Sequence, residues 1–166
     1  MSVETSSAAA PSSPGDPGEE LVITRAFAAP RELVWRAWTV AEHLSRWFAP
    51  HGATVEVVTA DARPGGTLHF CHHLAGGEDV WVKGVYREVE APRRLVIEGG
   101  FSDAQGNARE RPGFFHQTRM AVTFDEEPGG TRVTIRQGLD ADRGESEGWR
   151  EQLDRLAGYL AELRAG

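Results

Sequence analysis

The chain has 166 residues, of which 40% are hydrophobic and 26% are charged, an ordinary composition for one globular domain with a substantial core. Its formal net charge of −7 argues against a general affinity for nucleic acid or for an anionic membrane, because phosphate groups are bound by a basic face. No apolar stretch approaches the roughly 20 residues that span a bilayer, and the N-terminus lacks the pattern of a secretory signal. With a single cysteine, Cys71, the composition therefore predicts a cytoplasmic protein.

Residues 1–19 are rich in Ser, Ala, Pro and Gly and contain hardly any large apolar side chain. Such a segment cannot bury enough surface to offset the entropy lost on ordering it. We therefore expect a flexible tail over residues 1–19 and one folded domain over residues 20–166.

The folded part is expected to begin with a strand and two short helices. Residues 21–27 are rich in β-branched and aromatic side chains. Pro30 suits the first turn of a helix, where its missing N–H costs nothing. Val34, Trp35, Ala37 and Trp38 then form an apolar helical stripe. A second short helix is predicted over 41–48, ended by Pro50.

The middle of the chain changes to the alternating pattern of strands. Turn-forming sequences separate six predicted strands, at 54–58, 67–73, 80–89, 95–99, 115–124 and 131–137. Residues 102–114 are polar and rich in glycine, which is typical of a loop. Consecutive strands joined by short turns pair antiparallel, because a parallel crossover needs a dozen or more residues.

The C-terminal segment returns to helical spacing. Its large apolar residues recur at steps of four and three, which is the clearest periodic pattern in the chain: Trp149, Leu153, Leu156, Leu160 and Leu163. A sheet with one apolar face needs a cover, and this is the only long amphipathic element. We therefore expect an α+β helix-grip fold, with a curved antiparallel sheet of about seven strands wrapped around a long C-terminal helix and two short helices after the first strand.

Seven segments carry a family resemblance when they are taken in chain order. They are APRELVWRAWT (29–39), HLSRWFAP (43–50), RPGGTL (63–68), GVYREV (84–89), PRRLVI (92–97), GTRVTI (130–135) and GWREQLDRL (148–156). In this order they resemble the START-like (SRPBCC) superfamily, and within it the AHSA-like family of homologues of activators of heat-shock-protein ATPase. The resemblance spans about residues 21–164. It implies a helix-grip domain with a cavity, and its members include carriers, polyketide cyclases, hydrolase-like enzymes and co-chaperones, so function depends on the site.

Alternation indicates which strand side chains point inward. Leu68 and Phe70 share a face with His72, whereas His69, Cys71 and His73 point away. Applied to every strand, with the helices added, this rule predicts an apolar chamber with a few polar side chains: Trp38, Phe48, Leu68, Phe70, Ile97, Met120, Trp149 and Leu153, with His72, Tyr86, His116 and Gln137. Apolar walls with a few orienting polar groups are typical of a ligand site. The alternative is that these side chains only fill the core.

The chamber predicts binding of a small hydrophobic molecule of lipid, polyketide or aromatic type, with regulation as a further option. An enzyme of cyclase, isomerase or hydrolase type is the first alternative, in which His72, His116 or Tyr86 moves a proton. Glu98 alternates away from the chamber and is excluded from that role. A co-chaperone-like interaction module is the last alternative. The sequence leaves open a homodimer or another protein partner.

The run from His69 to His73 raises the question of a metal site. Successive residues on one strand face stand roughly 6.6 Å apart, so His69 and His73, about 13 Å apart, cannot share one ion. Cys71 with either of these histidines supplies two ligands, whereas zinc normally takes three or four. The sequence also lacks a phosphate-binding loop and a dinucleotide fingerprint. We therefore expect no metal site and no cofactor.

Overall fold

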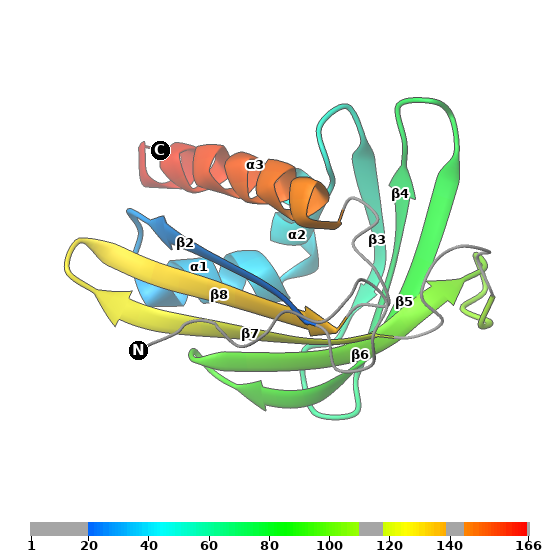
Figure 1. Cartoon of the computed structure of the whole chain (residues 1–166), viewed down its shortest axis with the longest axis horizontal. Helices are drawn as coiled ribbons and strands as arrows, with labels where there is room; N and C mark the ends of the chain where they lie inside the picture. The colour runs from blue at the N-terminus through cyan, green and yellow to red at the C-terminus, as the bar shows by residue number, and fades with distance from the viewer. Residues whose placement is uncertain (1–19, 110–117, 139–144, 166) are drawn as a thin grey trace.

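The computed structural model describes residues 20–109, 118–138 and 145–165. The tail predicted over residues 1–19 lies outside the described residues, as does His116. The elements follow one another as a strand, two helices, six strands and a helix, which is the predicted order (Figure 1): β2 (Glu20–Phe27), α1 (Arg31–Thr39), α2 (Ala41–Trp47), β3 (Thr54–Ala60), β4 (Thr67–His73), β5 (Asp79–Glu90), β6 (Arg94–Ser102), β7 (Thr118–Glu127), β8 (Gly130–Gly138) and α3 (Glu145–Ala165).

The strands form one seven-stranded sheet in the order β2-β8-β7-β6-β5-β4-β3, and every neighbouring pair is antiparallel. The two edge strands, β2 and β3, are consecutive in the chain, so α1 and α2 carry the chain from one edge to the other. Figure 1 shows the sheet curving beneath α3. α1 packs against β7 and β8, α2 packs against β3, and both contact α3. The predicted helix-grip fold is confirmed.

The core lies between the sheet and the three helices. The predicted stripe of α3 faces it, with Trp149, Leu153, Leu156 and Leu160 buried and Leu163 partly buried. The large side chains of the core from the other elements that are at most 2% exposed complete it: Val34, Leu44, Trp47, Tyr86, Leu95, Val122, Phe124, Val133 and Ile135. Burial of this apolar surface is the main stabilising contribution to the fold.

Several details differ from the sequence expectations. Pro30 is the N-cap of α1, with φ −62° and ψ 148°, so it precedes the first helical turn. β6 continues to Ser102 because its glycine-rich end pairs with β5, where Ser102 lies opposite Trp81. Irregular register occurs in β3 between Val57 and Thr59 and in β5 between Tyr86 and Glu88. The longer β6 and the two irregular registers depend on pairing between strands, which local sequence patterns do not report.

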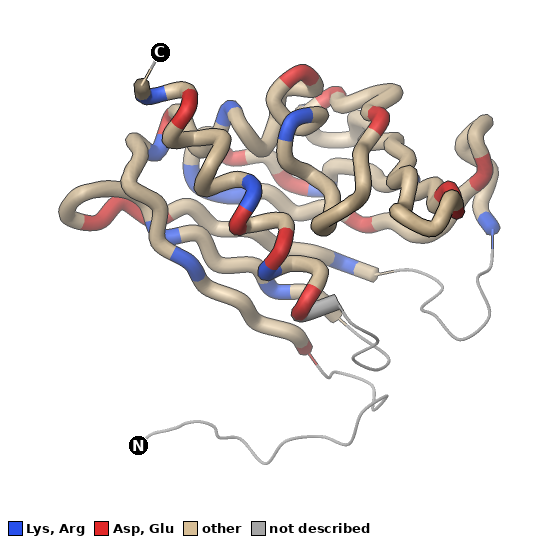
Figure 2. The backbone as a smooth tube through the Cα atoms, turned by 90° about the horizontal axis from the view of Figure 1, so that it is seen from above, with Lys and Arg blue, Asp and Glu red and all other residues tan. Residues whose placement is uncertain are grey.

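Charged residues are interspersed over the described surface. Figure 2 shows basic and acidic positions interspersed along α3 and along the rest of the described backbone. Several of them form ion pairs between neighbouring strands, such as Arg87 with Glu98 at 2.8 Å and Arg119 with Glu98 at 3.2 Å. These pairs are exposed and stabilise the fold only weakly. None of the described helices has the length and apolar character needed to cross a membrane.

Candidate functional site

A cavity of about 200 Å³ lies between the sheet and the first turns of α3. Five consecutive strands of the sheet, β4 to β8, form one wall, and Phe48 and α3 form the other. Most of its lining is apolar, and none of the described lining residues is acidic, lysine or arginine: Phe48, Leu68, Phe70, His72, Val82, Gly84, Ile97, Gly99, Thr118, Met120, Gln137, Gly148, Trp149 and Gln152. Such a lining favours an uncharged ligand.

Two glycines keep the sheet side of the cavity open. Gly84 of β5 and Gly99 of β6 lie directly opposite each other in the strand register, and both line the cavity. A Cβ atom on Gly84 would lie 2.9 Å from Cγ2 of Ile97. A Cβ atom on Gly99 would lie 2.4 Å from the carbonyl oxygen of Lys83. The backbones therefore approach at this point more closely than any side chain permits.

His72 is a polar wall residue whose tautomer follows from its partner. Nε2 lies 2.8 Å from the carbonyl oxygen of Phe48. A carbonyl only accepts hydrogen bonds, so Nε2 carries the proton and Nδ1 carries the lone pair in the neutral ring. Burial lowers the pKa of His72, and the nearby positive charge of Arg155 lowers it further, against the opposing effect of the Phe48 hydrogen bond. His72 therefore contributes an uncharged group.

A second polar contact joins the helix to the sheet. Nε1 of Trp149 donates a hydrogen bond to Oε1 of Gln137 over 2.8 Å, and both side chains are buried. Trp149 also stacks on Trp38, with ring centroids 5.8 Å apart and 22° between the planes. Because an indole N–H only donates, this contact fixes the orientation of the Gln137 amide. Trp149 is thus held on two sides as a rigid wall.

Gln152 lines the cavity and has an unpaired acceptor in its side chain. It lies three residues after Trp149 on α3, and the side chain is only 8% exposed. Its Oε1 atom is buried and accepts no hydrogen bond from any described group. A buried polar atom without a partner costs roughly 1–3 kcal/mol. A hydroxyl or N–H group of a bound molecule would remove that cost.

Comparison with known proteins assigns the chain to a family. The family described as "Activator of Hsp90 ATPase homolog 1-like protein" matches residues 28–161. The chain belongs to this family. Several solved structures share the fold of this family member, although no curated protein matches it.

Three of these structures show how widely the fold is shared. A protein from Chromobacterium violaceum is 25% identical, with a TM-score of 0.74 over 85% of this chain and 96% of that chain. A protein from Mycobacterium smegmatis is 26% identical, with a TM-score of 0.75 over 85% and 90% of the two chains. The AHSA1 protein from Silicibacter pomeroyi is 24% identical, with a TM-score of 0.68 over 86% and 97%. These likenesses support the helix-grip fold. They do not identify a ligand, so the ligand has to be argued from the residues of the site.

The structure places most of the predicted site residues of this family member around the cavity: Phe48, Leu68, Phe70, His72, Ile97, Met120, Gln137 and Trp149. Trp38 and Leu153 are buried in the core behind that lining. Tyr86 is also fully buried in the core and does not line the cavity. Its hydroxyl forms no hydrogen bond with any described group. Burial raises the pKa of Tyr86 to about 12. His116 lies outside the described residues.

Several lining residues are absent from the predicted site, although alternation along the strands does place Gly84 and Thr118 on the inward face: Val82, Gly84, Gly99, Thr118, Gly148 and Gln152. Gln152 carries a recognisable signal, because it is a polar residue on the buried side of an apolar helical stripe. Thr118 shares the alternation of Met120, and its hydroxyl donates to the carbonyl oxygen of Gly138. The glycines have no such signal, since their contribution is the space that a side chain would fill.

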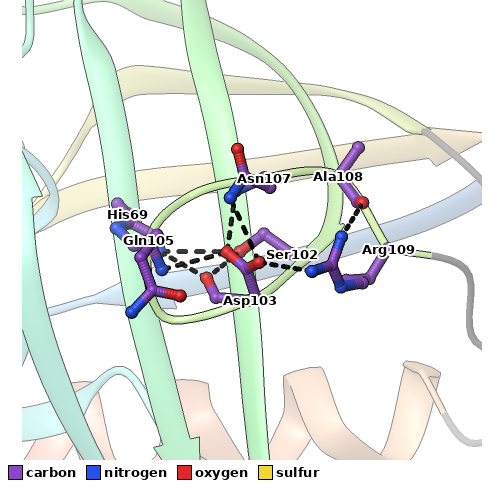
Figure 3. Close-up of polar contacts among 7 residues, drawn as sticks. All are labelled: His69, Ser102, Asp103, Gln105, Asn107, Ala108 and Arg109. Carbon is purple, nitrogen blue, oxygen red and sulfur yellow. Dashed lines mark hydrogen bonds and ion pairs between the residues drawn. The ribbon is translucent and has the colours of Figure 1, made fainter.

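The opposite face of β4 is covered at His69. His69 is 7% exposed, and its Nε2 donates to the carbonyl oxygen of Asp103 over 3.2 Å (Figure 3). The Asp103 carboxylate accepts hydrogen bonds from the backbone N–H groups of Gln105 and Asn107, each over 2.9 Å, and pairs with Arg109 at 2.8 Å. The Asn107 N–H is the main cause of a lowered Asp103 pKa. The segment after β6 thus folds over the outer side of the sheet.

Proposed function

We propose that this chain binds a small, uncharged, mostly apolar molecule that carries a hydroxyl or N–H group. The unpaired Oε1 atom of Gln152, a lining residue of this mostly apolar cavity, carries the proposal. A cavity of about 150 Å³ accepts benzene in another protein, and drug-sized ligands occupy roughly 300 Å³ or more. The volume of about 200 Å³ suits a single substituted ring better than a long lipid chain or a multi-ring polyketide.

Simple binding is favoured over acid–base catalysis by the polar groups that reach the cavity. A phenol hydroxyl of pKa about 12 is a poor proton donor near neutral pH, and Tyr86 lies outside the lining. His72 uses its Nε2 proton on the Phe48 carbonyl. Its Nδ1 lone pair keeps the enzymatic alternative open for a substrate with an acidic C–H or O–H group.

Filling the cavity from α3 tests the proposal. Gly148 lines the cavity, and a Cβ atom there meets no other atom within 4 Å. Gly148→Leu should weaken binding of p-cresol at least about tenfold, because its side chain occupies ligand space, while it favours the helix by about 0.5–1 kcal/mol. Chemical-shift titration of the Trp149 indole N–H measures the binding.

Gly158→Leu is the matched control for this experiment. Gly158 lies in the same helix, is exposed, and also meets no atom within 4 Å of an added Cβ. It should gain the same helix stability and bind p-cresol like the wild type. If the wild type binds no member of a panel of substituted phenols, anilines and short alcohols, or if both variants bind equally, the cavity is not a ligand site.

Gln152→Leu tests the polar half of the proposal. The change removes the unpaired acceptor and leaves an apolar side chain of similar size. We expect the ratio of p-cresol to toluene affinity to fall about fivefold to tenfold, which corresponds to one hydrogen bond of roughly 1 kcal/mol. Urea unfolding should show equal or higher stability, since a buried unpaired oxygen is lost. An unchanged affinity ratio would contradict hydrogen bonding to Gln152.

A further inference from the structure

The face of the β4–β5 hairpin opposite the cavity gathers a thiol, an imidazole and a carboxylate. Cys71 and His73 are alternate residues of β4, and Asp79 begins β5 directly opposite His73. Sγ of Cys71 lies 3.8 Å from Nδ1 of His73, which lies 2.7 Å from Oδ1 of Asp79. One potential ligand atom of each side chain lies within 4.8 Å of the others. The hairpin is at the upper right of Figure 1.

We propose that Cys71, His73 and Asp79 form a binding site for a divalent cation of zinc type. Zinc binds thiolate at about 2.3 Å and imidazole or carboxylate at about 2.0–2.2 Å, which puts tetrahedral ligand atoms about 3.4–3.6 Å apart. The distance between Sγ and Nδ1 is within a few tenths of an ångström of that spacing. Asp79 has to retreat by less than 1 Å, and its side chain is 55% exposed and free to do so.

The donor set selects among cations. A thiolate and an imidazole favour zinc and its neighbours in the transition series over magnesium or calcium, which prefer oxygen ligands. The thiolate and the carboxylate together offset both charges of the ion. Binding releases the thiol proton of Cys71 and the Nδ1 proton of His73 to solvent. Three protein ligands leave the fourth tetrahedral position to a water molecule.

Glu56 of β3 supports the same assignment, because it contacts the second ring nitrogen of His73. Its Oε1 lies 3.3 Å from Nε2 of His73. A carboxylate on the distal nitrogen of a metal-binding histidine fixes the ring and leaves the other nitrogen to the metal. Without a metal, His73 bridges Glu56 and Asp79 as an ion pair, so a proton on Nδ1 takes the place that the cation would take.

The site is accessible and separate from the cavity. The side chains of His73 and Asp79 are 41% and 55% exposed, whereas Cys71 is buried beside them. None of the three lines the cavity. His72, which lies between Cys71 and His73 on β4, points to the other face of the sheet and does line it. Sequence analysis found two of these ligands on β4, and the register of the hairpin adds the third.

Cobalt titration of the untagged full chain, freed of metal with a chelator, tests the site. We expect one Co²⁺ per chain, a thiolate-to-cobalt charge-transfer band in the near ultraviolet, tetrahedral visible bands, and displacement by Zn²⁺. Cys71→Ser should abolish the charge-transfer band. Asp79→Asn and His73→Gln should weaken binding at least about tenfold, and Glu56→Gln about tenfold.

His51→Gln is the matched control, since it removes an exposed histidine outside the cluster. It should bind Co²⁺ like the wild type. Asp79→Asn alters an exposed side chain and keeps the test valid even if a Cys71 variant fails to fold. The proposal is overturned if the wild type gives no thiolate band, or if Cys71→Ser or Asp79→Asn binds Co²⁺ as tightly as the wild type.

Discussion

Replacing Trp47 with alanine is expected to lower the free energy of unfolding by about 3–5 kcal/mol. The Trp47 side chain is fully buried, and its Nε1 donates to the carbonyl oxygen of Ala37 over 2.8 Å. Its ring meets Trp38 and Phe48 edge to face, with centroids 4.9 and 5.2 Å apart. Alanine leaves a cavity and an unpaired carbonyl. Because natural domains are stable by only about 5–15 kcal/mol, urea unfolding will show a large shift of the midpoint.

Trp35→Ala provides the comparison for this loss. Trp35 is only partly buried, and its ring has one aromatic contact, with Phe124 at 5.3 Å. Its truncation should cost clearly less than that of Trp47. Equal losses for the two tryptophans would mean that α2 does not anchor the core as its packing indicates. Since neither residue lines the cavity, any folded variant should retain p-cresol binding within about twofold.

The fold was predictable where one pattern repeats over many residues. The stripe from Trp149 to Leu163 spans almost the whole of α3, and tertiary packing reinforces the same residues. The end of β6 was not predictable, because Gly99 and Gly100 have weak strand preference on their own. They belong to the strand only because Lys83 and Gly84 lie opposite them. The local sequence indicates only the strand propensity of each residue, whereas the length of β6 follows from its pairing with β5.

The sequence predicts which side chains point toward the cavity, but not which of them reach it. Alternation correctly places Leu68, Phe70 and His72 on one face of β4. It cannot separate an inward side chain that reaches the cavity from one that fills the core behind it, as Trp38 does. Nor can a single strand reveal that Asp79 stands opposite His73, because that juxtaposition depends on the register of the β4–β5 hairpin.

The two faces of β4 therefore carry different chemistry from one alternating sequence. His72 faces an apolar cavity, where burial keeps it neutral, while Cys71 and His73 face a polar cluster at the outer surface. Hydrogen bonding to Asp79 is the main cause of a raised His73 pKa. The pKa values of these adjacent histidines are thus shifted from the ordinary value in opposite directions. The environment of each face, rather than the residue type, decides what each group can bind.

Gly99→Ala should be the most damaging of the small substitutions at the site. The added Cβ would lie 2.4 Å from the carbonyl oxygen of Lys83 and 2.7 Å from Cα of Gly84, and neither backbone atom can move without opening the β5–β6 pairing. Overpacking of this kind typically costs about 1–3 kcal/mol, and rigid backbone neighbours favour the upper end. Urea unfolding measures the loss, and p-cresol binding should fall with it, because Gly99 lines the cavity.

Gly76→Ala is the control that separates this clash from a general cost of replacing glycine. Gly76 lies in the turn between β4 and β5, and a Cβ atom there meets nothing within 4 Å. At such a position alanine restricts the unfolded chain and is expected to change stability by less than about 1 kcal/mol. A Gly99→Ala variant as stable as Gly76→Ala would show that β5 and β6 can separate at little cost. In that case the close approach of the two backbones would not be what requires glycine at position 99.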